Sequence, residues 1–145
     1  MEYIQKVEID CNDIKKVKNE FNNLMFLKHL TKPLPLKIIE WDGTDDGAKA
    51  HLAVWFFGWK DFIVEHAENI ENEIGFSFVD EGTCLPFHLK NWRHKHGAYK
   101  TDQRIFIKDE VCFTTESKFL DIILFPILVL PIIIRKIFYK TYNWE

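Results

Sequence analysis

The stretch RIFIKDEVCFTTESKFLDIILFPILVLPIIIRKIF, residues 104–138, contains the transition that decides the fold. From Ile105 to Phe113 every second side chain is apolar except Asp109, and one apolar face at a two-residue period is typical of a strand. This pattern then ends, and residues 119–134 are apolar except for Asp121. Cations beginning at Arg135 follow, as is favourable at a helix C-terminus. The stretch therefore predicts a strand followed by a long apolar helix.

The two-residue period also occurs upstream, in β-branched or aromatic segments bounded by turn residues. A first strand is followed by helical spacing with Asp10 or Asn12 as the expected cap, and then by a second short helix. Successive strands without an intervening helix predict an antiparallel meander. The order is β–αα–β6–α, an α+β fold whose curved seven-stranded sheet wraps around the terminal helix. The remaining predicted strands are 3–10, 34–41, two within 48–68 that turn near Gly58, 73–80 and 87–99.

Length and composition predict one globular domain over residues 1–145. A chain of 145 residues, 47% hydrophobic and 28% charged, can bury a core without disulfides or metal. Its formal net charge of −3 lacks the basic character that phosphate backbones require, so nucleic acid is not an expected partner. Three cysteines in no zinc pattern, and a charged N-terminal strand in place of a signal peptide, predict a cytoplasmic protein.

The apolar helix has two interpretations. A membrane span needs about 20 residues to cross about 30 Å of hydrocarbon, whereas residues 119–134 reach about 24 Å at about 1.5 Å per residue. The segment also contains Asp121, and Pro126 and Pro131 are expected to kink the helix or break it locally. The pattern favours a core helix, with a membrane-associated helix as the alternative.

The last two predicted strands carry candidate site residues. Trp92, His94 and His96 share one side of a strand, and Asp109 shares a side with apolar neighbours on the next strand. A turn at residues 100–102 places His94 opposite Asp109 or one pair away, where a carboxylate would raise the histidine pKa. The pair is a ligand anchor, a general base, or a hydrogen bond that only fixes strand register. No metal site is predicted, because a third ligand with recognisable spacing is missing, and no cofactor is expected.

A curved sheet has only one enclosed face, so these side chains are predicted to line a dry cavity beneath the helix. Enclosed apolar spaces with a few polar groups are the usual form of small-molecule sites. No residue is assigned a catalytic role. The predicted ligand-binding residues are Trp92, His94, His96, Asp109, Val111 and Phe113 on the sheet, with Phe125, Leu128 and Val129 on the helix.

Three stretches carry a resemblance to a known superfamily: LTKPLPLKII at 30–39, FVDEGTCLPFHLKNWRHKH at 78–96, and D-x-V-x-F at 109–113. They resemble the START-type, pollen-allergen-like (SRPBCC) superfamily, also called the helix-grip fold, and within it a bacterial ligand-binding or polyketide-cyclase-like branch. Phe113 replaces the tyrosine usual in that branch, and the first helix starts less apolar, at 10–13. The resemblance implies a helix-grip fold over the whole chain. It also implies an interior for lipids, sterols, polyketides or other apolar molecules, in which a minority of members catalyse cyclisation or dehydration.

These observations predict a carrier or sensor that binds a hydrophobic small molecule, lipid-like or polyketide-like, between the sheet and the C-terminal helix. One alternative is a cyclase or dehydratase that uses His94 and Asp109. Another is a membrane-surface protein anchored by the apolar helix. A binding protein is favoured over an enzyme, and a small molecule over a membrane as the partner. The sequence does not indicate the oligomeric state.

Overall fold

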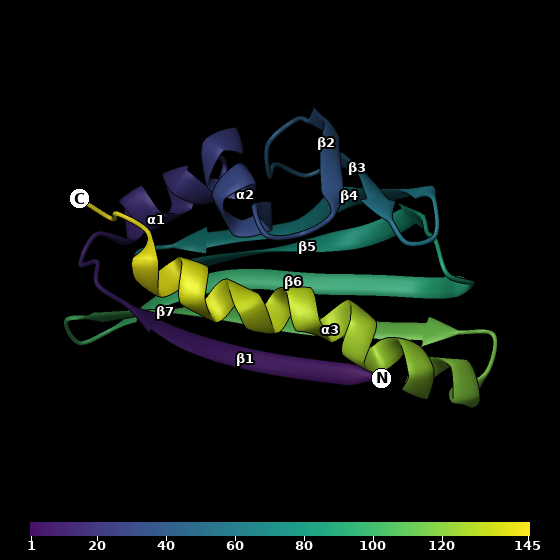
Figure 1. The fold of residues 1–145 in the computed structure, drawn as a ribbon. Coiled ribbons are helices and arrows are strands. Elements are labelled where there is room, and N and C mark those ends of the chain that lie inside the picture. Colours follow the sequence, from purple (N-terminus) through teal and green to yellow (C-terminus); the bar gives the residue numbers. More distant parts are fainter.

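One antiparallel sheet and three helices make up the fold in a computed structural model that describes residues 1–145 (Figure 1). Helix α3 lies along the concave face of the sheet, and the two short helices cover one end of it (Figure 1). The elements are β1 (Glu2–Ile9), α1 (Ile14–Phe21), α2 (Leu24–Thr31), β2 (Leu36–Trp41), β3 (Lys49–Trp55), β4 (Trp59–Asn72), β5 (Gly75–Cys84), β6 (Leu89–Thr101), β7 (Arg104–Thr115) and α3 (Lys118–Thr141).

The strands are ordered β1-β7-β6-β5-β4-β3-β2, and every neighbouring pair is antiparallel. Strands β2 to β7 follow one another as a meander. The first strand, β1, then pairs with the last strand, β7. The predicted seven-stranded sheet and the order β–αα–β6–α are therefore confirmed.

Two local predictions about the helices were wrong. The cap of α1 is Asp13 instead of Asp10 or Asn12, because its carboxylate accepts from the backbone N–H groups of Lys15 and Lys16 directly after it. Helix α3 also runs through Pro126 and Pro131 as one helix, so the expected local break is wrong, while the alternative of a kink stays a prediction. Pro126 is exposed, so water can reach the carbonyl that lacks its usual partner, and packing of the opposite helix face keeps the segment helical.

The inner face of α3 forms part of the core, as predicted. Leu124, Leu128, Val129 and Ile132 are buried, and Tyr139, in the last turn of the helix, is fully buried. By length and composition α3 is also long and apolar enough to cross a membrane. Its contacts with β1 and β7 show that this face is occupied by the sheet.

The buried apolar residues form two separate clusters along the sheet. One lies beneath α1, α2 and the C-terminal end of α3 and includes Phe26, Ile107 and Tyr139. The other lies beneath the first half of α3 and includes Trp92 and Val129. The buried histidines, Gln5 and Asp109 lie between the two clusters.

Candidate functional site

A line of polar side chains crosses the inner face of the sheet between the two apolar clusters. It runs from α3 across β1, β7, β6, β5 and β4. Most of its members on the sheet are paired with another polar residue on the neighbouring strand. Gln5 pairs with Asp109, which pairs with His96, and Asp80 pairs with both His94 and His66. We call this set the polar belt: Gln5, His66, Asp80, His94, His96, Asp109, Arg135 and Tyr139.

Asp109 is the centre of the polar belt and is fully buried. Its carboxylate accepts hydrogen bonds from Gln5 Nε2 at 2.9 Å, His94 Nε2 at 3.0 Å and the Tyr139 hydroxyl at 3.3 Å. Burial alone would raise the pKa of Asp109, but the hydrogen bond from His94 and the adjacent His96 hold that pKa well below its usual range. Asp109 is therefore an ionised carboxylate in the interior.

His94 and His96 lie with their ring centroids 3.7 Å apart, and their environments differ. His96 Nε2 is 2.9 Å from Asp80 Oδ2, and its Nδ1 is 3.2 Å from Asp109 Oδ1. Although burial opposes it, these two carboxylates raise the pKa of His96. Burial and the charge of His96 lower the pKa of His94 to about 4. The expectation that the carboxylate raises the pKa of His94 was therefore wrong, because burial beside a second histidine outweighs the hydrogen bond to Asp109.

Asp80 connects the belt to the far side of the sheet. Burial would raise its pKa, but His96 and His66 hold it well below the usual range. His66 Nδ1 donates to the Ala48 carbonyl at 3.0 Å, which fixes the ring with its Nε2 3.0 Å from Asp80 Oδ1. The negative charges of Asp80 and Asp109 then balance the positive charges of protonated His96 and the Arg135 guanidinium. Together these four groups carry no net charge.

Three buried side-chain atoms have no hydrogen-bond partner, and all three belong to the belt: Asp80 Oδ1, His96 Nδ1 and Arg135 Nε. The first two are close to His66 and Asp109, but the atoms are not aligned for a hydrogen bond. Buried polar atoms are nearly always paired, and an unpaired one costs about 1–3 kcal/mol. This concentration of unpaired atoms distinguishes the belt from the rest of the interior.

Asp80, His96 and Arg135 line one cavity of about 40 Å³ between the helices and the sheet. Such a volume holds a few water molecules at most. Its wall is otherwise mainly apolar. The remaining lining residues are Phe21, Phe26, Leu27, Leu30, Trp41, His66 and Phe78.

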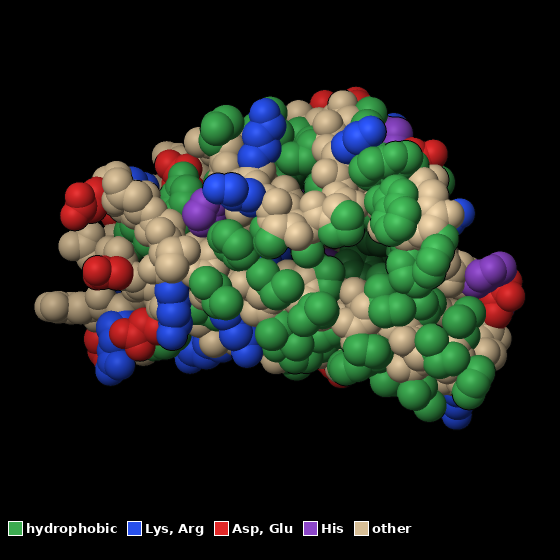
Figure 2. Space-filling view, in the orientation of Figure 1, with side chains coloured by type: hydrophobic (Ala, Val, Ile, Leu, Met, Phe, Trp, Pro, Cys, Tyr) green, Lys and Arg blue, Asp and Glu red, His purple; other side chains and the backbone are tan.

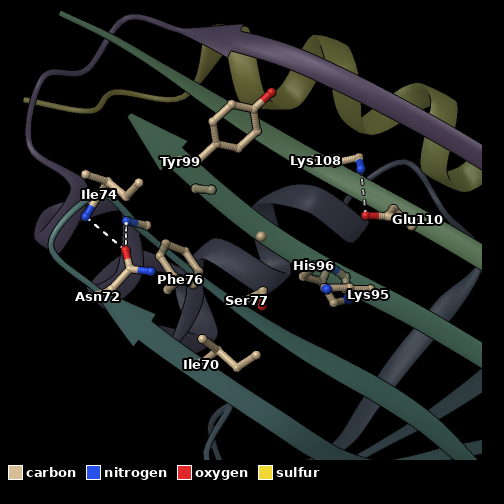
Figure 3. Close-up of a pocket in the computed structure, with 13 residues that line it drawn as sticks. Ile70, Asn72, Ile74, Phe76, Ser77, Lys95, His96, Tyr99, Lys108 and Glu110 are labelled. Atoms are coloured by element: carbon tan, nitrogen blue, oxygen red, sulfur yellow. Dashed lines mark hydrogen bonds and ion pairs between the residues drawn. The ribbon is translucent and has the colours of Figure 1, made fainter. Parts of the chain in front are cut away.

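A larger hollow of about 410 Å³ lies on the outer face of the sheet, and His96 is the one member of the polar belt among its lining residues (Figure 3). It is an open groove, and Gly97 contributes no side chain to fill it. Lys108 and Glu110 at its edge bond to each other at 2.8 Å (Figure 3). Because its polar groups do not converge on a common point, we place the candidate site at the smaller, inner cavity.

Comparison of the sequence with known protein families and with curated proteins finds no match. The structure is nevertheless similar to solved structures over nearly its whole length. Norcoclaurine synthase from Thalictrum flavum has a TM-score of 0.65 at 14% identity, covering 96% of this chain and 90% of that one. The Zhui aromatase/cyclase from Streptomyces sp. R1128 has a TM-score of 0.64 at 8% identity, with coverages of 96% and 90%. Ara h 8.0201 has a TM-score of 0.57 at 12% identity, with coverages of 96% and 97%.

The chain has the helix-grip fold. The fold expected from the three quoted stretches is thereby confirmed, and identities this low show the fold alone. In this helix-grip domain the predicted site residues of the sheet all point inward and are buried, as are Leu128 and Val129. Phe125 is half-buried and packs against the second cluster.

Of the predicted ligand-binding residues, only His96 lines the inner cavity. The predicted dry space beneath the helix is filled, because Trp92, Val111, Phe113, Leu128 and Val129 pack against one another in the second cluster. His94 and Asp109 lie behind His96. Whether these residues contact a ligand stays a prediction.

The sequence analysis missed Gln5, His66, Asp80, Arg135 and Tyr139 as members of this helix-grip site. A signal for the strand members was present, since each is a polar residue in the inward phase of its strand. Gln5 lies between Tyr3 and Val7, for example. These inward polar residues indicate a common site only once the strand register is known, because the register places them side by side across the sheet.

The argument against a metal site also changes in the helix-grip structure. Asp80, from the neighbouring strand, supplies the third donor that was thought to be missing, and its ligand atom and those of His94 and His96 lie within 4.8 Å of one another. These three residues could hold a cation only if His96 lost its proton, and the cation would lie near the positive charge of Arg135. The positions of the three ligand atoms would suit a metal ion, but the positive charges of His96 and Arg135 oppose the binding of a cation.

Proposed function

We propose that this helix-grip protein binds an apolar small molecule with a polar head group, in the space between α1, α2, the sheet and α3. The observation that carries the proposal is that all three unpaired buried atoms belong to residues lining one cavity with a mainly apolar wall. A few convergent polar groups in an apolar pocket are typical of a small-molecule site.

The unpaired atoms define the head group. Arg135 Nε–H requires an acceptor, whereas the Asp80 carboxylate oxygen requires a donor. A hydroxyl or a phenol provides both, and an apolar body would lie against Phe21 and Phe26. One solved neighbour, the norcoclaurine synthase, is described in complex with dopamine and hydroxybenzaldehyde, both of which carry phenols. That likeness supports the class of ligand and does not identify the molecule.

Ligand binding requires the cavity to expand. Small-molecule sites typically measure about 300–1,000 Å³, compared with about 40 Å³ here. The elements that separate most easily from the sheet are α1 and α2, since each is a single helix of 8 residues. We propose that these two helices move outward together and take Phe21 and Phe26 with them.

The test compares two tryptophan substitutions on α2. Leu27 lines the cavity, whereas Met25 on the same helix is 63% exposed. We expect native mass spectrometry of the protein as purified, or titration with 1-anilinonaphthalene-8-sulfonate, to show one small molecule per chain. Leu27→Trp should weaken probe binding about tenfold or more, because the larger ring fills the cavity, and Met25→Trp should leave it unchanged. No bound molecule in either measurement, or equal effects of the two substitutions, would refute the proposal.

A second candidate is acid–base catalysis, favoured by the divergence of the pKa values of two adjacent histidines. Such divergence is common where one group donates a proton and another accepts it. The pair facing the cavity is His96 with Asp80, whereas the predicted pair of His94 and Asp109 lies behind it. An enzyme of the cyclase or dehydratase type would lose activity in Asp80→Asn and keep it in His94→Gln. The reverse result would exclude this arrangement.

A further inference from the structure

The outer face of α3 is apolar along most of the helix. From Phe119 to Ile133 every exposed residue of α3 is apolar. In the most apolar stretch of 18 residues within this helix, only 28% of the residues are buried. We call the exposed set the outer stripe: Phe119, Ile122, Ile123, Ile127, Leu130 and Ile133. Helices that are apolar all round are normally covered on every side.

A second group of exposed apolar side chains lies at the turn between β3 and β4. Trp55, Phe56, Phe57 and Trp59 are 49%, 38%, 86% and 50% exposed, and we call them the aromatic tip. Phe57 has φ 50, a left-handed conformation that is rare for a bulky residue. The turn therefore holds the most exposed ring of the group outward at a cost in backbone strain.

The aromatic tip and the outer stripe belong to the same face of the molecule. In Figure 2 the apolar side chains gather over α3 and over the β3–β4 turn, with a hollow between them. A contiguous apolar surface of this kind marks an interaction site in a soluble domain. Because the inner face of α3 packs on the sheet and Arg135 extends into the polar belt, the helix does not cross a bilayer in this fold.

Charges around the two groups indicate what covers them. Lys118 precedes the outer stripe and Lys136 and Lys140 follow it, all exposed, while Lys37 lies 4.1 Å from the ring centre of Trp59. Asp121 is engaged with the Thr115 backbone N–H. The chain as a whole is negative, with a formal charge of −3, so these cations mark a local positive rim.

We propose that this face docks on the surface of an anionic lipid membrane, with the aromatic tip and the outer stripe inserted among the lipids and the lysines on the head groups. Tryptophan and phenylalanine are suited to the membrane interface, and lysines gain energy near anionic head groups. Two acidic side chains close in sequence to these groups, Asp61 and Glu116, lie 2.8 Å from His51 and 3.9 Å from His88. The docking face does not depend on the proposed ligand.

The test is flotation of the full chain with phosphatidylcholine vesicles, with and without phosphatidylglycerol. The wild type should float with the anionic vesicles, and added salt should weaken binding. Phe57→Asn should lower the partition coefficient about tenfold or more, because one large ring leaves the lipid. Asparagine tolerates the left-handed conformation, so the turn is kept. Ile122→Gln should have a similar effect.

The matched control is Ile74→Asn. Ile74 is 63% exposed, comparable to Ile122, but it lies at the β4–β5 turn beside the outer groove. This variant should bind vesicles like the wild type. Failure of the wild type to float with either vesicle overturns the proposal. A second result also overturns it: the wild type does not bind vesicles, is a dimer in light scattering, and becomes a monomer in Ile122→Gln. In that case the face joins two copies of this chain.

Discussion

Replacing Asp109 with asparagine is the sharpest perturbation of the polar belt. The substitution keeps the shape of the side chain and removes its charge. In the wild type, Gln5 Nε2 and His94 Nε2 donate to different oxygens of the carboxylate, and His96 Nδ1 lies 3.2 Å away. An amide has only one acceptor oxygen, so one of the two donors would face an NH₂ group. We therefore expect both an electrostatic loss and a hydrogen-bond clash.

The magnitude follows from the charge balance. Asp80 and Asp109 oppose His96 and Arg135, so loss of one carboxylate leaves an excess buried positive charge. Removing one partner of a buried ion pair typically costs about 3–5 kcal/mol. Release of the proton from His96 would relieve part of this cost, so we expect the free energy of unfolding to fall by about 3 kcal/mol. A domain is usually stable by only about 5–15 kcal/mol.

Urea unfolding at pH 7, followed by tryptophan fluorescence, measures the effect. With a slope of about 2 kcal/mol/M, the midpoint should fall by about 1.5 M. The control is Glu110→Gln at the next residue of β7, whose side chain faces the other side of the sheet and pairs with Lys108. It should change stability by less than about 0.5 kcal/mol, as expected of a surface pair. A loss below about 1 kcal/mol in Asp109→Asn would refute the view that the belt is an ionised, balanced network.

Three further predictions concern other parts of the molecule. The pKa of His94 is about 4 in the folded protein, below its usual 6.5; the unfolded chain therefore binds the proton first, and the wild type should lose up to about 3 kcal/mol as the pH falls from about 6.5 to about 4. His94→Gln should lower this slope of stability with pH in urea titrations, and an unchanged slope would exclude the assignment. Removal of residues 118–145 exposes the second apolar cluster, so size-exclusion chromatography should show an aggregated chain. A soluble truncated chain that unfolds cooperatively would contradict this prediction. Elemental analysis of protein purified without an affinity tag should find no stoichiometric zinc or iron, because Arg135 and protonated His96 oppose a cation; one metal per chain would disprove this.

The architecture could be predicted from the sequence because its signals are local. The two-residue period of the apolar face over 104–115, the apolar run after Ser117 and the turns between strands each depend on neighbouring residues. The cap at Asp13 shows the limit of such signals, since several polar residues in 10–13 compete for one role. The local break expected at Pro126 is absent for a similar reason: the sequence does not show that its face of the helix is open to water.

The candidate site was only partly predictable because it is assembled across strands. The contact between His94 and Asp109 followed from the phase of two adjacent strands, and their side chains are indeed 3.0 Å apart. Asp80 and His66 join them only through the register of β4, β5 and β6. The charge of Arg135 was assigned to a helix end, whereas this half-buried side chain belongs to the belt, with its Nε in the interior. Filling of the space below Trp92 depends on packing, which no sequence period indicates.

A buried ionic network such as the polar belt is not the only way to fill the interior of a sheet, and this bears on its purpose. Replacing a whole buried ionic network with apolar residues of similar size is often neutral or stabilising, and on either side of the belt the inner face of this sheet is apolar. The outer stripe is the opposite case, because it places apolar side chains in water. Exposed isoleucines on α3 do not contribute to the stability of the fold. Sites that depart from what folding requires are commonly functional. In this chain both departures meet on one helix, with Arg135 turned toward the cavity and Ile122 toward the proposed membrane.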